Sequence, residues 1–326
     1  MSGTSHDAAY HAPPPGTGLV FDLEYRRHDP GPGHPESPDR YLALAEAFRK
    51  SRILESAVRI APRTASEDDV HLAHTRQYWK TVLHDVGRKA QRLSTGDTNL
   101  GEHSLDTALL AAGGALSVVD AVMKGSVKNA FAAVRPPGHH ANASRGMGFC
   151  VFNTAAIAAR YAQRVFGVDR VLIVDWDVHH GNGTQEIFYS DPNVLFFSTH
   201  QWPWYPGTGA ADETGEGAGA GYTINCPFPA GSGHAEVLGA FRKKLLPAAL
   251  DFKPALVLIS AGFDSRRGDP LGRFTLRDSD FAEMTSIAME IAAASAAGRL
   301  VSILEGGYSL NGLAKAALAH FETLRG

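Results

Sequence analysis

The stretch VLIVDWDVHHGNGTQ, residues 171–185, is the part of the sequence that says most about the fold. It begins with the apolar run Val171–Val174, which is typical of a strand buried on both faces of a parallel sheet. The run passes directly into a segment with two aspartates and two adjacent histidines. Because ligands of open α/β sheets bind beyond the carboxyl ends of the strands, we expect this segment at a functional site.

Further short apolar runs along the chain are expected to be strands. They are Leu19–Phe21, Phe131–Val134, Val194–Phe197, Leu256–Ile259 and Leu300–Leu304. Segments of helical length, rich in alanine and leucine, lie between them: Tyr41–Ser51, Leu105–Lys124, Thr154–Phe166, Ala235–Leu250 and Ser279–Ala297. This alternation predicts an α/β fold of three layers, with a mostly parallel sheet between helices on both faces.

Length and composition favour one folded unit without a strongly charged partner. Of the 326 residues 44% are hydrophobic, which excludes disorder over most of the chain. The 31 basic and 34 acidic residues nearly balance, so nucleic-acid binding is not expected. Residues 1–16 are small and polar with three prolines, and we expect a flexible extension there before a single domain at 17–326.

Cysteine content and hydropathy give an expectation for the cellular location of the protein. Only Cys150 and Cys226 are present, and no charged segment followed by an apolar run opens the chain. A disulfide framework and a secretory signal are therefore not expected, and a cytoplasmic location is. No run approaches the roughly 18 consecutive apolar residues that would predict a membrane span.

Asp177 and His179 are candidate metal ligands. They lie two apart at a strand end, so both side chains project from one face, and their oxygen and nitrogen donors suit Zn²⁺. Asp264, just past another buried strand, is the natural third ligand and leaves a fourth position open for water. Taken alone, the pair would more often be a loop carboxylate and a hydrogen-bonded histidine, but the neighbouring loops make that alternative less plausible.

Two pairs of adjacent histidines, His139-His140 and His179-His180, follow different strands. Histidine is the side chain suited to proton transfer near neutral pH. The first pair comes after the proline-locked segment RPPG (135–138), which favours a fixed position. Tyr308 follows two glycines and could aim its hydroxyl at developing negative charge, although an isolated tyrosine more often serves packing.

The motifs of these loops, in their order along the chain, resemble the zinc-dependent histone deacetylase family. They are GPGHPESPDR (31–40), RPPGHHA (135–141), GMGFCVFN (146–153), DWDVHHGNGTQ (175–185), the tryptophan-containing PGTG loop STHQWPWYPGTG (198–209), AGFDSRRGDPLG (261–272) and EGGYS (305–309). The resemblance spans about residues 17–320. With Trp176 and Asn182 at these positions, the sequence resembles the class II branch of the family and its bacterial amidohydrolase relatives.

This resemblance implies a fold, a metal and a reaction. The fold would be that of arginases and deacetylases, a parallel sheet of about eight strands between helices. One Zn²⁺, or alternatively Fe²⁺, would lie at the carboxyl edge, held by Asp177, His179 and Asp264. The reaction would be hydrolysis of the acetyl amide of a lysine-like amine.

Catalytic roles follow from the same matching of positions. His140 would take the proton of the attacking water and return it to the leaving amine, while His139 would supply electrostatic support. His139 would bond to Asp175 and His140 to Asn182, and since a carboxylate raises its partner's basicity more than an amide, His140 would be the neutral base. Tyr308 would donate to the oxyanion.

The resemblance also implies a tunnel for the acyl-lysine stem. Phe149 and Tyr205 would form its walls, with Tyr205 standing where the family commonly has phenylalanine. The Gly148 carbonyl would face the substrate amide N–H, and Gly306 would lie beside the substrate.

At the rim, Leu271 stands where the acetylpolyamine-selective vertebrate member has glutamate. An apolar gate does not attract a cationic polyamine, so acyl-lysine or another apolar-stemmed amide is favoured. Asp97 roughly matches a residue that grips the substrate backbone.

Structural potassium is a further implication of the family resemblance. One site would involve Asp175, Asp177, His179, Ser198 and Thr199, and a second would lie around Phe188, Asp191, Val194 and Tyr222.

Three functions remain open at this stage. A deacetylase of acetyl-lysine-like substrates leads, and a deacetylase of acetylated polyamines or other small amides comes second. The third, a non-catalytic acyl-lysine binder, would be expected to lack a metal ligand, His140 or Tyr308, and none is missing. The sequence leaves the assembly open, and a homo-oligomer would alter the tunnel mouth.

Overall fold

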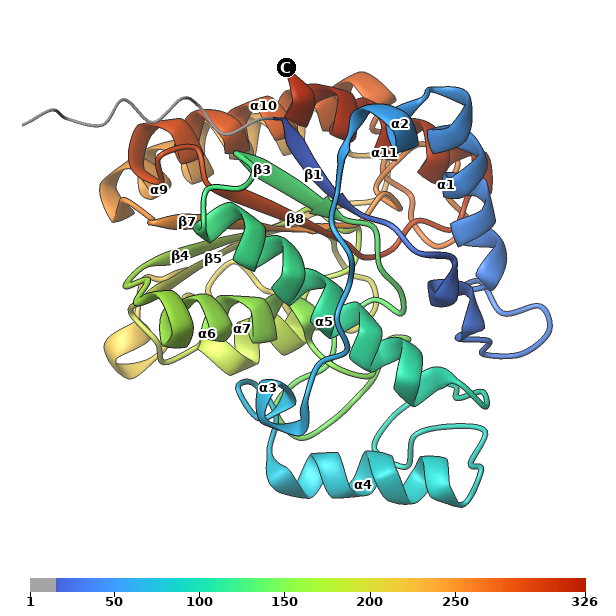
Figure 1. The fold of residues 1–326 in the computed structure, drawn as a ribbon. Coiled ribbons are helices and arrows are strands. Elements are labelled where there is room, and N and C mark those ends of the chain that lie inside the picture. Colours follow the sequence, from blue (N-terminus) through green and yellow to red (C-terminus); the bar gives the residue numbers. More distant parts are fainter. Residues whose placement is uncertain (1–15) are drawn as a thin grey trace, which may run out of the picture.

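Eight parallel strands form one sheet in the computed structural model, which describes residues 16–326 (Figure 1). Across the sheet the strands run in the order β2-β1-β3-β8-β7-β4-β5-β6. Their bounds are Thr17–Val20 (β1), Val58–Arg59 (β2), Asn129–Ala132 (β3), Val171–Asp175 (β4), Val194–Gln201 (β5), Thr223–Phe228 (β6), Leu256–Ala261 (β7) and Leu300–Leu304 (β8). The predicted α/β class and the parallel sheet are confirmed.

Helices cover both faces of the sheet. Figure 1 shows α5, α6 and α7 on one face and α1, α10 and α11 on the other. The α-helices are Pro38–Lys50 (α1), Ile53–Ser56 (α2), Glu67–Val70 (α3), Arg76–Gly87 (α4), Ser104–Met123 (α5), Thr154–Phe166 (α6), Asn182–Phe188 (α7), His234–Ala240 (α8), Leu246–Phe252 (α9), Asp278–Ser295 (α10) and Leu310–Arg325 (α11). Short 3₁₀ turns lie at Leu23–Arg27 (η1) and Gly217–Gly219 (η2), and a π-helical segment, Phe241–Leu245 (η3), joins α8 to α9.

The six predicted strands all occur, and the two that the sequence did not predict lie at the edges of the sheet. β2 has only two residues, both exposed, so it lacks the apolar run of a buried strand. β6 reads TINCPF and pairs with β5 alone, so its mixed polarity and its proline suit an edge.

Helix α5 is long and apolar enough to cross a membrane by length and composition, and 67% of its most apolar window is buried inside the protein. It packs against β1, β3 and α6. Its apolar character is therefore that of a helix in a protein core. The extension expected at residues 1–16 lies outside the described residues, except for Gly16.

The strand order brings the predicted site residues together. Four neighbouring strands, β3, β8, β7 and β4, point their carboxyl ends to the same edge. The histidine pair follows β3, Tyr308 follows β8, Asp264 follows β7, and the loop with Asp177 follows β4. Residues up to 169 positions apart in the sequence thus meet at one place.

Candidate active site

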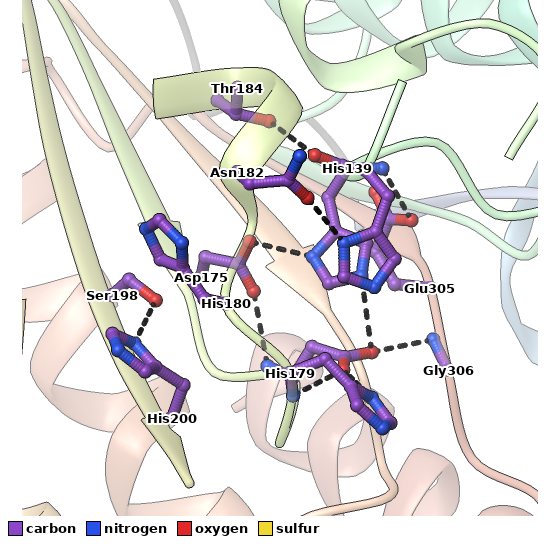
Figure 2. Close-up of polar contacts among 12 residues, drawn as sticks. His139, Asp175, His179, His180, Asn182, Thr184, Ser198, His200, Glu305 and Gly306 are labelled. Carbon is purple, nitrogen blue, oxygen red and sulfur yellow. Dashed lines mark hydrogen bonds and ion pairs between the residues drawn. The ribbon is translucent and has the colours of Figure 1, made fainter. Parts of the chain in front are cut away.

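Asp177, His179 and Asp264 converge at the carboxyl edge of β4 and β7, with one ligand atom from each within 4.8 Å of the others. His179 Nδ1 lies 3.0 Å from Asp177 Oδ1 and 3.2 Å from Asp264 Oδ2. All three side chains are buried. Backbone groups orient the carboxylates: the N–H of Val178 donates to Asp264 Oδ1 over 2.7 Å. The N–H of Gly306, which is labelled in Figure 2, donates to Asp177 Oδ2 over 2.9 Å.

The electrostatics of these three residues fit a bound cation. Asp264 Oδ2 is buried and accepts no hydrogen bond from the described residues, although His179 Nδ1 lies 3.2 Å away. Burial and the nearby Asp177 carboxylate raise the pKa of Asp264 to about 7. Burial alone would lower the pKa of His179, but the two carboxylates outweigh it and raise this pKa to about 10. Two buried carboxylates and an imidazole in contact are costly without a positive charge between them, and this donor set suits Zn²⁺.

Two glycines, Gly262 and Gly306, pack so closely against the carboxylates that no side chain fits there. A Cβ added to Gly262 would lie 2.1 Å from Asp177 Oδ2, and one added to Gly306 would lie 2.2 Å from Asp264 Oδ2. Any larger residue at either position would push the carboxylates out of place.

The adjacent histidines His139 and His140 have different partners. His139 Nδ1 is hydrogen-bonded to Asp175 Oδ2 over 2.9 Å (Figure 2). His140 Nδ1 is hydrogen-bonded to Asn182 Oδ1 over 2.8 Å. Both hydrogen bonds are those that the sequence led us to expect. Because the amide oxygen of Asn182 accepts, His140 carries its proton on Nδ1, which leaves Nε2 free to accept a proton.

These surroundings shift the pKa values of the two imidazoles in opposite directions. Burial would lower the pKa of His139, but Asp175 and Asp177 outweigh it and hold this pKa well above its ordinary value. Burial and the charge on His139 hold the pKa of His140 well below its ordinary value. The protonated form of His139 and the neutral form of His140 are thus favoured in two rings that lie side by side, with ring centroids 4.0 Å apart.

Glu305, which the sequence reasoning did not single out, holds the histidine pair. Its Oε2 accepts the backbone N–H groups of Gly138 over 2.6 Å and His139 over 3.2 Å. Its Oε1 is buried without a partner. Burial raises the pKa of Glu305 to about 7 against the opposing effect of His139. The only signal in the sequence was its position in the EGGYS motif.

Arg40 and Asp269 hold the segment that carries Tyr308, and neither was predicted. The guanidinium of Arg40 donates to the carbonyl oxygens of Glu305 and Gly307, both over 2.6 Å, and lies 5.0 Å from the centre of the Tyr308 ring. Asp269 Oδ2 accepts the N–H of Tyr308 over 2.7 Å. Both residues lie inside quoted motifs, but nothing in the motifs showed which backbone atoms they would reach.

A cavity of about 280 Å³ opens onto these groups. It is lined by Asp97, His140, Gly148, Phe149, His179, Trp204, Tyr205, Leu271 and Tyr308. Five of the six predicted substrate-binding residues are among them. Gly306 is not, because it lies behind Asp177, to which its N–H donates.

The walls of this cavity are mostly aromatic. The Phe149 and Tyr308 rings meet edge to face at 5.8 Å, and the Tyr205 ring meets His140 edge to face at 5.2 Å. A Cβ on Gly148 would lie 2.2 Å from the His140 ring, so this wall position requires glycine. Such a lining suits a slender, apolar stem that leads to the buried polar groups.

Comparison with known proteins identifies the family. The Histone deacetylase domain matches residues 34–324. The chain belongs to the histone deacetylase family. As a member of this family it is a deacetylase, which is a hydrolase of amide bonds.

Several relatives of this deacetylase are similar over most of its length. A "Probable deacetylase" of Archaeoglobus fulgidus is 43% identical, with 91% of this chain and 82% of that protein covered. The "Polyamine deacetylase HDAC10" of Homo sapiens is 40% identical over 89% of this chain and 44% of that protein. The crystal structure of the HDA15 HD domain superposes with a TM-score of 0.89 at 39% identity, covering 95% of this chain and 89% of that one. This deacetylase thus spans less than half of the human protein's length.

The residues expected at potassium sites fall into two groups. In the first, Asp175 and Ser198 are paired neighbours on β4 and β5, and Ser198 Oγ lies 2.9 Å from His200 Nδ1 (Figure 2). In the second, Phe188, Asp191 and Val194 lie between the end of α7 and the start of β5, and Tyr222 directly precedes β6. The potassium sites of this deacetylase stay predictions.

Proposed function

We propose that this deacetylase removes acetyl or related acyl groups from acetyl-lysine-like substrates. One observation carries the proposal: the aromatic cavity of about 280 Å³ is lined at once by His179, His140 and Tyr308. An amide at the inner end of a slender stem would therefore reach a metal ligand, a proton acceptor and a hydroxyl donor together.

Asp177, His179 and Asp264 would hold the metal, which we propose to be Zn²⁺, with Fe²⁺ as the alternative. When bound, such an ion polarises the amide carbonyl and lowers the pKa of a water molecule. The buried Oδ2 of Asp264, which accepts no hydrogen bond from the described residues, supports this assignment.

His140 is proposed as the general base and then the general acid. Its lowered pKa keeps it neutral, and its Nε2 is unprotonated because Nδ1 donates to Asn182. It can accept the proton of the attacking water and return it to the nitrogen of the leaving amine. His139, held in its charged form by Asp175, would favour the negative charge that develops nearby.

Tyr308 is proposed to donate a hydrogen bond to the carbonyl oxygen as that oxygen becomes negative. Burial raises the pKa of Tyr308 well above its ordinary value, against the opposing charge of Arg40, so the hydroxyl keeps its proton. Loss of one such donor costs about 10²–10³ in rate in other enzymes.

Leu271 and Arg273 at the rim favour an apolar stem over a polycation, against the attraction of the Asp97 carboxylate that lines the same cavity. Leu271 lines the cavity, and the Arg273 guanidinium lies 5.5 Å from the centre of the Trp204 ring, which brings a positive charge close to the lining. Acetylated polyamines and other small acetylated amines are the second candidate. Similarity to polyamine deacetylases at about 40% identity supports that candidate.

The test is a comparison of kcat/KM for metal-loaded protein on an acetyl-lysine peptide, a trifluoroacetyl-lysine peptide and N-acetylputrescine. We expect the acetyl-lysine peptide to exceed N-acetylputrescine by about tenfold or more, which corresponds to about 1.4 kcal/mol. The Tyr308→Phe and Asp264→Ala variants should lose activity on every substrate. Preference for N-acetylputrescine would overturn the substrate assignment, and cleavage of no amide would overturn the reaction.

A further inference from the structure

Asp97 joins the two sides of the cavity mouth. Its Oδ1 accepts the backbone N–H of Gly148 over 2.7 Å, and its Oδ2 accepts the hydroxyl of Tyr205 over 3.0 Å. Asp97 and Tyr205 are 108 positions apart in the sequence and lie on different loops. We call the three residues Gly148, Asp97 and Tyr205 the rim bridge.

The rim bridge lies at the entrance of the cavity and reaches solvent. All three of its residues line the cavity, and Asp97 is the one carboxylate among the lining residues that the structure describes. The side chains of Asp97 and Tyr205 are exposed, with 37% of Tyr205 accessible. The Tyr205 ring also packs edge to face against His140, so this exposed tyrosine contacts one of the proposed reacting groups.

Both oxygens of the Asp97 carboxylate are engaged within the protein. Burial and the nearby Asp97 raise the pKa of Tyr205, so its hydroxyl stays protonated and donates. A substrate that brings an N–H group to the mouth would find in Asp97 the only anionic acceptor of the lining, with one oxygen already bonded to Tyr205. The substrate would have to displace or share that hydrogen bond.

We propose that Tyr205 is a specificity-determining residue that acts through Asp97. By occupying Oδ2 of Asp97, Tyr205 weakens the binding of substrates that place N–H donors at the cavity mouth, such as those with a peptide backbone. Substrates without such donors are not affected in this way. The inference rests on the proposed function, since it concerns the part of the substrate that bears the acylated amine. Phenylalanine at this position would keep the aromatic wall and release the carboxylate.

A matched pair of substrates tests the proposal. One is a short acetyl-lysine peptide, and the other is its twin in which the two backbone amides flanking acetyl-lysine are N-methylated. The measured quantity is the ratio of kcat/KM for the peptide to kcat/KM for the twin, in metal-loaded protein. In the Tyr205→Phe variant this ratio should rise about three- to tenfold, the size expected for one exposed hydrogen bond to a charged acceptor.

Two controls separate the rim bridge from other effects of losing a hydroxyl. Tyr161 on α6 donates to Asp120 on α5 over 2.9 Å, a bond of the same kind that does not line the cavity. The Tyr161→Phe variant should leave the ratio as in the parent protein. In an Asp97→Ala background, Tyr205→Phe should no longer change the ratio, because a double-mutant cycle isolates the coupling between the two side chains.

Each result has a definite reading. A ratio that rises only when Asp97 is present supports the proposal. A ratio that is unchanged or falls in Tyr205→Phe, or that rises equally in the Asp97→Ala background, overturns it while the proposed function stands. If the parent protein cleaves neither substrate, the proposed function itself fails and the inference fails with it.

Discussion

The backbone N–H of His139 donates to the side chain of Glu305 over 3.2 Å, and this contact links the histidine pair to the segment that carries Tyr308. Within the same segment, the N–H of Gly306 reaches the metal-ligand candidate Asp177. The short segment Glu305–Tyr308 after β8 therefore contacts His139 and Asp177 and also supplies the tyrosine. We infer that these parts of the site keep their relative positions as one unit.

Replacement of Glu305 tests whether its hydrogen bonds hold the histidine pair in position. Because both N–H donors bond to one oxygen, the Glu305→Gln variant can keep them through its amide oxygen, while Glu305→Leu cannot. We expect Gln to retain kcat within about tenfold and Leu to lose about 10²-fold or more, as expected when reacting groups are misplaced. Circular dichroism would establish that both variants are folded. Equal losses in the two variants would show that the hydrogen bonds to Gly138 and His139 do not matter.

The same carboxyl predicts a pH dependence of stability. The pKa of Glu305 is about 7 in the folded protein against an ordinary value of 4.5, so between these values the folded state holds a proton that the unfolded state has lost. The contribution of Glu305 to the free energy of unfolding is fully present below about pH 4.5 and is lost as the pH rises through 7. The change is on the order of 3 kcal/mol. Urea unfolding of metal-free protein should therefore show the parent losing stability relative to Glu305→Gln over this window. A constant difference between the two would refute the prediction.

The neutral partner of His140 can be exchanged for a charged one. In the Asn182→Asp variant a carboxylate would face Nδ1 over the present 2.8 Å contact and stabilise the imidazolium. The pKa of His140 would rise, and since the proposed base must be neutral, the acidic limb of the kcat/KM profile should move to higher pH. A pH-rate profile from pH 5 to 9 measures this. A limb that stays in place or moves to lower pH would exclude His140 as the titrating base.

The segment GPGHPESPDR (31–40) depends for its stability on Glu36, a fully buried carboxylate. It accepts hydrogen bonds from Arg40 and Arg135, each at 2.8 Å. The Glu36→Ala variant leaves two buried guanidinium groups without their counter-charge and should lose about 3–5 kcal/mol in the free energy of unfolding. Glu46→Ala, which removes a surface partner of Arg49, is the matched control and should change the melting temperature little. Similar effects in both variants would contradict the argument.

Much of the fold could be predicted from the sequence because buried parallel strands produce continuous apolar runs. Val171–Val174 and Leu256–Ile259 are such runs, and both lie inside strands at the centre of the sheet. The strand Val58–Arg59 could not be predicted, since two exposed edge residues leave no periodic pattern. The segment 235–250 has a uniform helical pattern, yet a π-helical segment from Phe241 interrupts it.

The candidate site was predictable where side-chain chemistry is local to a motif. Asp177 and His179 lie two apart, and their motif indicates a metal site without reference to the rest of the chain. Glu305 and Asp269 act on backbone N–H groups of residues that the fold brings near, and such pairings leave no trace in local spacing. For the same reason the hydrogen bond between Tyr205 and Asp97 could not be predicted from the sequence, although both residues were expected near the cavity mouth.

Stepwise addition of Zn²⁺ to metal-free protein, with acetate release from an acetyl-lysine peptide as the readout, tests the central claim most directly. The account predicts that acetate release rises with added metal and saturates at a single ion per chain, as the cluster of Asp177, His179 and Asp264 requires. The Asp264→Asn variant should need at least about 10²-fold more metal. Acetate release by metal-free protein, or none by the metal-saturated protein, would contradict the account.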